Sequence, residues 1–174
     1  METLKGNTIS LRALEPEDVT FLFEMENDEQ FWQVSNTQAP FSKYLLKNYI
    51  EQSHQDIYQA KQLRLIIEGK ASNQAIGMID LFDFDPQHKR AGIGVLVHPA
   101  HQQKGYASEA LELLITYCFH HLGLHQVYAN ITSDNTKSIA LFEKHLFKKI
   151  GLKKEWISYN NSFKDEILYQ RIHD

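Results

Sequence analysis

The chain of 174 residues is poor in cysteine, proline and glycine, with one, four and eight of them respectively. A single thiol, Cys118, cannot form an internal disulfide, which fits a reducing compartment, and we expect a cytoplasmic protein. So few prolines and glycines leave no long stretch with the composition of a disordered segment. No run approaches the roughly eighteen apolar residues of a membrane span, and the first residues lack the apolar core of a signal peptide. Membrane association is therefore not expected.

Basic residues are also scarce, since 18 Lys and Arg face 22 Asp and Glu for a net charge of −4. A broad basic face for nucleic acid is therefore disfavoured. Gly123 separates His121 from His125, so the two do not form a metal pair, and no metal is predicted. Cys118 lies on the apolar stripe of a predicted helix and is expected to be an inert core thiol. The length fits one folded domain, residues 1–174, with a full core.

The most informative stretch, Gly92 to Leu111, has the pattern of a strand, a loop and a helix. Alternating apolar residues form the strand, Pro99 ends it because proline has no N–H, and an amphipathic helix follows Gly105. The first amides of that helix have no intrahelical partners and carry the positive end of the helix dipole. We therefore expect an anion such as a pyrophosphate there, close to Gly105, with donors from Lys104 and Gln102.

Two motifs in this chain resemble those of the GCN5-related N-acetyltransferases (GNAT). Gln102-Gln103-Lys104-Gly105-Tyr106-Ala107 is similar to the acyl-CoA signature [RQ]-x-x-G-x-[GA] of that family. The segment from Asp134 to Lys144 is similar to its second motif, a helix with the pattern N-x-x-[SA]-x-x-[LIF]-[YF]-x-K. The resemblance covers nearly the whole chain. It is strongest to the branch that contains ribosomal-protein N-terminal acetyltransferases and spermidine acetyltransferases.

Periodicity predicts one α/β (α+β) domain with a mixed, mostly antiparallel sheet of about seven strands and about four helices. The resemblance implies a V-shaped gap between strands Gly92–Val97 and Val127–Thr132, with acetyl-CoA in it, and a backbone N–H near Leu96 and Val97 for the reaction's oxyanion. The cofactor residues that it implies are Val95, Leu96, Val97, Gln102, Gln103, Lys104, Gly105, Tyr106, Ala107, Ser108, Asn135, Ser138 and Lys144. Other expected elements are a strand at 8–14, a helix from Pro16, a polar loop at 27–37, helices at 43–59 and 104–122, and a final hairpin of 157–159 with 163–170.

The chain departs from its relatives where proton transfer is concerned. Members of this branch commonly carry Glu where Gly92 stands, as a proton relay, and Tyr where Phe142 stands, as the acid for the leaving thiol. The usual K-x-G-F sequence lacks its glycine, because Leu146 takes that place. Replacement bases could be Asp80, Asp83, Glu68 or His98, and spacing favours none of them. Asn135 is expected either near the thiol of the cofactor or as a helix cap.

These observations favour an N-acetyltransferase that moves an acetyl group from acetyl-CoA to a primary amine by direct attack in a ternary complex. The acceptor is a polyamine-like small molecule or a peptide N-terminus. The alternative is an acyl-CoA-binding sensor or interaction module without transfer. Four carboxylates are either a wall for a cationic acceptor or a solvated helix face, and these are Glu24, Glu26, Asp28 and Glu29. A homodimer is left open.

Overall fold

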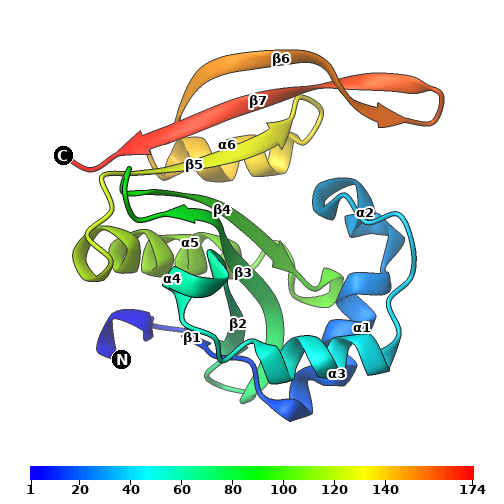
Figure 1. Cartoon of the computed structure of the whole chain (residues 1–174), viewed down its shortest axis with the longest axis vertical. Helices are drawn as coiled ribbons and strands as arrows, with labels where there is room; N and C mark the ends of the chain where they lie inside the picture. The colour runs from blue at the N-terminus through cyan, green and yellow to red at the C-terminus, as the bar shows by residue number, and fades with distance from the viewer.

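A seven-stranded sheet organises the computed structural model, which describes residues 1–174. The strand order is β1-β2-β3-β4-β5-β7-β6, and every neighbouring pair is antiparallel except β4 with β5. The predicted mixed, mostly antiparallel sheet is confirmed (Figure 1). The strands are β1 (Ile9–Arg12), β2 (Leu63–Gly69), β3 (Gln74–Asp85), β4 (Arg90–Val97), β5 (Gln126–Thr132), β6 (Lys148–Tyr159) and β7 (Ser162–Ile172).

The helices differ in number from the four expected, because six α-helices form. They are α1 (Val19–Asn27), α2 (Glu29–Ser35), α3 (Lys43–Gln52), α4 (Ile57–Ala60), α5 (Tyr106–Thr116) and α6 (Thr136–Lys144). The predicted loop at 27–37 was wrong, since most of it is α2. The side chain of Asp28 caps α2 by accepting the N–H of Gln30 at 3.0 Å, and buried Phe31 anchors the helix. The predicted helix 43–59 is divided into α3 and α4, because Asp56 caps a new start.

Other predicted boundaries shift by a few residues. The strand expected at 8–14 is the shorter β1, and Pro16–Asp18 forms a 3₁₀ turn before α1. The helix expected at 104–122 is α5 followed by a π-turn at Tyr117–His121. The final hairpin is present but longer than expected, and Asn160 and Asn161 form its turn with φ of 45° and 59°.

Side chains on the two faces of the sheet form two hydrophobic cores. The larger, of 25 residues, packs α5 against the sheet, and the smaller, of 8 residues, packs α1, α2 and α3 against the other face. Strand β2 contributes to both, since Leu65 and Ile67 belong to the larger core and Ile66 to the smaller one. Figure 1 shows the corresponding layers, with α5 on one side of the sheet and α1 and α3 on the other.

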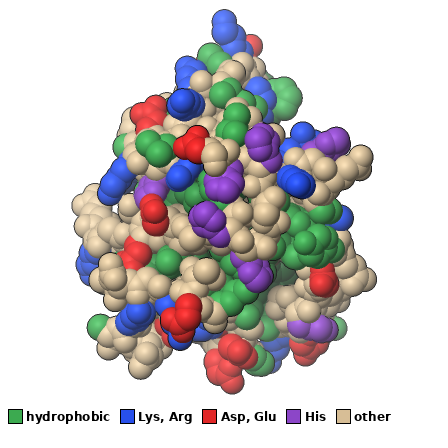
Figure 2. Space-filling model, turned by 90° about the vertical axis from the view of Figure 1, so that its left-hand side faces the viewer, with side chains coloured by type: hydrophobic (Ala, Val, Ile, Leu, Met, Phe, Trp, Pro, Cys, Tyr) green, Lys and Arg blue, Asp and Glu red, His purple; other side chains and the backbone are tan.

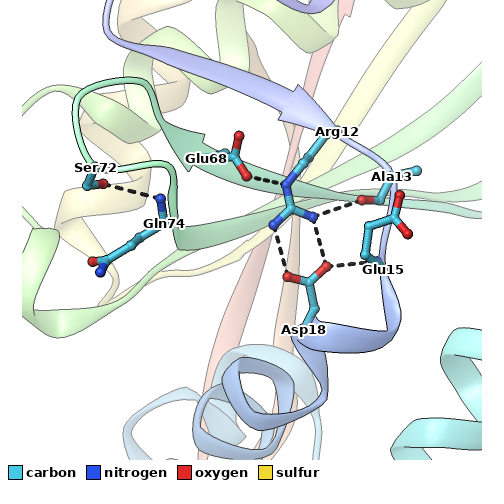
Figure 3. Close-up of polar contacts among 7 residues, drawn as sticks. All are labelled: Arg12, Ala13, Glu15, Asp18, Glu68, Ser72 and Gln74. Carbon is cyan, nitrogen blue, oxygen red and sulfur yellow. Dashed lines mark hydrogen bonds and ion pairs between the residues drawn. The ribbon is translucent and has the colours of Figure 1, made fainter.

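Arg12 on β1 fixes the start of the smaller layer to the sheet (Figure 3). Its guanidinium donates to both carboxylate oxygens of Asp18, at 2.8 and 2.9 Å, and to Glu68 on β2. Asp18 also accepts the N–H of Glu15 at 2.8 Å. Burial alone would raise the pKa of Asp18, but the hydrogen bonds from Arg12 and Glu15 outweigh it, so the pKa is lowered.

Strands β4 and β5 diverge after a short parallel contact, which forms the predicted gap. They pair only at Arg90–Gln126, Ala91–Val127 and Gly92–Tyr128. Beyond Gly92, β4 stays paired with β3 as far as Val97, while β5 follows β7. The backbone groups of β4 that point toward β5 after Gly92 therefore have no strand partner.

Candidate active site

A cavity of about 630 Å³ lies where β4 ends and α5 and α6 begin. Its walls include the last residues of β4, the loop and first turn of α5, the first turn of α6 and the outer face of α2. The structure brings all of the predicted cofactor residues to this cavity except Lys104 and Lys144. Lys144 is exposed at the end of α6. Lys104 is exposed, and its Nζ donates to the carbonyl of Ala100 at 3.3 Å.

A smaller hollow of about 60 Å³ lies between the diverging strands β4 and β5. Gly94 of β4, Ala129 and Asn130 of β5, Phe142 of α6 and Glu166 of β7 are among the residues of its wall. It shares several lining residues with the large cavity, namely Gln33, Val34, Val95, Thr132, Asn135 and Ser138. The two hollows therefore adjoin, and together they lead from the N-terminus of α5 to the point where the sheet opens.

The N-terminus of α5 has the features expected of an anion site. Gly105 is its N-cap with φ of 84°, and no side chain caps the first amides. A Cβ added at Gly105 would meet no protein atom within 4 Å, so the space beside this backbone is open. The amide nitrogen of Gln102 donates one hydrogen to the carbonyl of Val97 at 3.0 Å, and its second hydrogen remains for the predicted contact with a phosphate. Gln102 thus braces the loop against β4.

Several residues at this cavity were not predicted. His101 and Lys137 line it, and Gln30, Gln33 and Val34 of α2 form its outer wall. Partial burial lowers the pKa of His101, and the charges of Lys104 and His98 lower it further. No spacing in the sequence pointed to α2, because its place over the cavity depends on tertiary packing.

Lys164 of β7 links α2 to the segment just before α6 at the wall of the cavity. Its ammonium donates to Gln33 of α2 at 2.8 Å and pairs with Asp134, just before α6, at 2.6 Å. The same nitrogen lies 3.9 Å from the ring centroid of Tyr159. Helix α2 is therefore joined to the α6 end of the cavity through one side chain from a distant strand.

Asn135 caps α6 and also lines both hollows. Its Oδ1 accepts the N–H of Ser138 at 3.2 Å, as the capping interpretation requires. It also lies in the wall where the two hollows adjoin. The geometry is compatible with both interpretations at once.

The two departures from the family pattern have structural counterparts. A Cβ on Gly92 would lie 2.2 Å from Cε2 of Phe82, so the ring of Phe82 fills the place where a larger residue would begin. That ring packs edge-on against Tyr128 at a centroid distance of 5.8 Å. Phe142 is buried in the wall of the small hollow and packs edge-on against Phe147 at 5.0 Å. Neither position offers a group that can transfer a proton.

None of the four residues suggested as bases lines either hollow. Asp80 forms a bidentate pair with Arg64, at 2.8 and 2.7 Å. Glu68 pairs with Arg12, as described above. Nδ1 of His98 accepts the N–H of Ala100 at 3.2 Å, which occupies one ring nitrogen. Asp83 is exposed and has a positive φ of 48°, and the hydroxyl of Tyr128 lies 3.4 Å from its carboxylate.

Glu166 is a carboxylate that no motif or spacing in the sequence singles out. It lines the small hollow, its side chain is 12% exposed, and it pairs with Lys153 of β6 at 2.7 Å. The register of β7 with β5, which places Glu166 opposite Thr132, brings it there. A strand that alternates apolar and polar residues gives no signal of this kind.

The acidic cluster proposed as an acceptor wall is only partly free. Glu26 pairs with Arg64, and Asp28 is the cap of α2. Glu24 and Glu29 are exposed. None of the four lines either hollow.

Metal-ligating and nucleophilic side chains do not converge elsewhere. Figure 2 shows histidine side chains gathered on one face of the molecule, and the rings of His120 and His173 lie 5.4 Å apart. No group of three or more His, Cys, Asp or Glu side chains is placed to hold a metal ion. Cys118 is fully buried in the larger core, and burial raises the pKa of its thiol, so the prediction of a core thiol is confirmed. No helix is both long and apolar enough to cross a membrane.

Comparison with known proteins gives consistent results. The family described as Acetyltransferase (GNAT) domain matches residues 8–148. An uncharacterized N-acetyltransferase p20 of Bacillus licheniformis is 31% identical, over 90% of this chain and 88% of that protein. The spermidine N(1)-acetyltransferase of Vibrio cholerae is 26% identical, over 92% of this chain and 90% of that protein. The crystal structure of spermidine N-acetyltransferase from Vibrio cholerae in complex with CoA and spermine has the same fold, with a TM-score of 0.87, 24% identity and 96% of each chain covered.

Proposed function

The chain belongs to the acetyltransferase (GNAT) family and is an acetyl-CoA-dependent N-acetyltransferase, and from that premise we propose that its acceptor is a cationic primary amine of the polyamine type. The cofactor lies in the large cavity and the amine enters the small hollow. One observation carries this proposal. The two hollows adjoin, so a ligand held at the N-terminus of α5 reaches the opening between β4 and β5.

Successive parts of the cavity wall suit the pyrophosphate, the pantetheine arm and the thioester of acetyl-CoA. The uncapped amides of α5 and the open space at Gly105 would hold the pyrophosphate, and Lys137 adds a positive charge. The unpaired backbone edge of β4 would hydrogen-bond the amides of the pantetheine arm. The thioester would then lie near Asn135, where the hollows adjoin.

The small hollow favours an alkyl ammonium as the acceptor. Glu166 in its wall pairs with the ammonium of Lys153 through Oε1 at 2.7 Å, and Oε2 is left to accept the ammonium of an acceptor. The hollow is narrow, with a volume of about 60 Å³. That space admits an unbranched –CH₂–NH₃⁺ end more easily than the substituted α-carbon of a peptide N-terminus. The names of similar proteins, spermidine N-acetyltransferases, support the same class.

The acceptor must lose a proton before it attacks. An alkyl ammonium with a pKa near 10 is about 0.1% neutral at pH 7, which corresponds to roughly 4 kcal/mol. The apolar side of the hollow, with Ile93, Ile131 and Phe142, disfavours the charged amine, and Glu166 is the carboxylate placed to receive its proton. The neutral nitrogen then forms a bond to the acetyl carbon, and unpaired N–H groups of β4 stabilise the oxyanion. The C–S bond breaks, coenzyme A leaves as the thiolate, and the nitrogen loses its second proton to that thiolate or to water, which gives the neutral amide.

The test is release of coenzyme A from acetyl-CoA with a panel of amines that runs from monoamines through spermidine to peptides with free N-termini. We expect polyamines to give the highest kcat/KM. Glu166→Gln should lower the kcat/KM for polyamines by about tenfold or more. A tenfold change corresponds to the loss of about 1.4 kcal/mol of interaction with the charged amine. A double Glu24→Gln, Glu29→Gln variant removes exposed charges outside both hollows and serves as the matched control.

Three results would contradict the proposal. Preferential turnover of peptides would exclude the polyamine class as the acceptor. Full activity of Glu166→Gln, with loss of activity in the double variant, would move acceptor recognition to the exposed carboxylates of α1 and α2. Binding of acetyl-CoA with no turnover of any amine would favour the alternative of a binding module.

A further inference from the structure

A hydrogen-bonded line of three side chains leads from the cofactor cavity, through a buried histidine, to an exposed carboxylate. Ser108 lines the cavity, and its Oγ lies 2.8 Å from Nε2 of His145. Nδ1 of the same ring lies 3.1 Å from a carboxylate oxygen of Glu112. Ser108 and Glu112 are four residues apart on α5, so they share one face of that helix. His145, at the end of α6, is 7% exposed and lies between them.

The carboxylate of Glu112 determines which nitrogen of His145 carries the hydrogen. A carboxylate only accepts hydrogen bonds, so Nδ1 must be the donor. In the neutral ring Nε2 is then an acceptor, and the hydroxyl of Ser108 must donate its single hydrogen to it. Ser108 consequently presents only lone pairs to the cavity, and these repel a phosphate oxygen.

Protonation of His145 reverses the hydrogen bond. Nε2–H then donates to Ser108, and the serine hydrogen is free to point into the cavity. Ser108 lies in the first turn of α5, where the helix amides already favour an anion. A phosphate at this position and a proton on His145 therefore stabilise each other. Such a coupling acts equally in both directions.

Without a bound anion, the surroundings of His145 lower its pKa on balance. Burial lowers the pKa of His145, Glu112 on α5 raises it, and the positive charges of Lys144 on α6 and Arg171 on β7 lower it again. Arg171 is held close, since its guanidinium donates to the carbonyl of His145 at 3.0 Å. A bound pyrophosphate adds negative charge on the side of Ser108, which these groups do not supply.

We propose that binding of the coenzyme A pyrophosphate at the N-terminus of α5 is coupled to the uptake of a proton by His145, through reversal of the Ser108 hydrogen bond. His145 is thus a positioning residue that acts on the cofactor through Ser108. The inference rests on the proposed function for the identity of the ligand. Cofactor affinity should fall as the pH rises, by up to about tenfold per pH unit while one proton is taken up.

The experiment is calorimetric titration of the whole protein with dephospho-CoA in two buffers of different protonation enthalpy, between pH 6 and pH 8. Dephospho-CoA is the probe because the 3′-phosphate of coenzyme A itself titrates near pH 6. We expect the wild-type protein to take up a substantial fraction of one proton. His145→Gln cannot titrate and should take up none. Ser108→Ala removes the hydroxyl but keeps the buried ring and its carboxylate, so it should also lose the proton uptake. This variant provides the test if His145→Gln folds poorly.

His101 provides the matched control, because it is the histidine that lines the cavity directly, whereas His145 reaches it only through Ser108. His101→Gln should retain the proton uptake. Equal uptake by the wild-type protein and His145→Gln, or a loss of uptake only in His101→Gln, would overturn the proposal. If neither the wild-type protein nor any variant bound dephospho-CoA or CoA, the proposed function would be refuted as well. Binding without proton uptake would refute this inference alone.

Discussion

Replacement of Gly105 by alanine tests the cofactor site with little interference from the fold. Gly105 has φ of 84°, and an added Cβ would meet no protein atom within 4 Å. The left-handed conformation costs an alanine about 1–2 kcal/mol, of which about 0.4–1 is recovered because alanine restricts the unfolded chain. We therefore expect a loss of about 1 kcal/mol in the free energy of unfolding, or roughly 2–4 °C in Tm for a chain of this size.

Gly123 gives an unusually close control for this change. It also has a positive φ, 64°, with nothing within 4 Å of an added Cβ, but it does not line the cavity. Gly123→Ala should cost about the same stability and leave cofactor binding unaltered. In Gly105→Ala the methyl group occupies the space where the pyrophosphate meets the backbone, so affinity for coenzyme A should fall by at least about tenfold, or 1.4 kcal/mol.

Thermal unfolding with and without coenzyme A measures both effects. A ligand at 100 times its Kd adds about 2.7 kcal/mol to the stability of the protein that it binds. The wild-type protein and Gly123→Ala should gain equally, and Gly105→Ala should gain clearly less at the same concentration. If Gly105→Ala were stabilised as much as Gly123→Ala, the pyrophosphate could not lie against the backbone of Gly105.

Further predictions concern the cap, the missing acid and the Arg12 pair. Asn135→Ala should lower the free energy of unfolding by about 1 kcal/mol through loss of the α6 cap, and unchanged kinetics of CoA release would limit Asn135 to that role. Phe142→Tyr should change kcat by less than about tenfold, because a thiol with a pKa near 8.5 leaves readily as the thiolate, and a larger gain would mean that protonation of the thiolate limits the reaction. The pKa of Asp18 is lowered in the folded protein, so the stability that its pair with Arg12 contributes is present above the unfolded value near 3.9 and is lost as the pH falls through the folded value. Urea unfolding between pH 3 and pH 7 should show a flatter acid limb for Asp18→Asn than for the wild-type protein.

The sequence predicted the centre of the fold because local signals agree there. The alternation of β4, the break at Pro99 and the glycine before α5 each specify the same strand, loop and helix. The turn at Asn160 and Asn161 was likewise predictable, since asparagine tolerates a positive φ. These features depend on residues that are neighbours in the chain.

The parts of the site that could not be predicted depend on residues distant in the chain. Helix α2 has seven residues, too few to be stable alone, and buried Phe31 holds it in place. Its contact with Lys164 spans 131 positions of the sequence. Glu166 reaches the small hollow through the register of β7, and Gln102 turns to Val97 because that carbonyl has no strand partner on the β5 side. Hydrophobic periodicity carries no information on any of these contacts.

The contact between Phe82 and Gly92 also limits how such a site can change during evolution. A glutamate at position 92 of this chain would collide with the ring of Phe82, at 2.2 Å from its first side-chain atom. Truncation of Phe82 first would remove the contact of its half-buried ring with Tyr128, with no gain in activity. Neither single substitution is neutral, and only the pair together would be tolerated. A descendant of this protein can thus acquire that carboxylate only across an epistatic barrier, and selection for faster proton transfer is expected to act first on other positions.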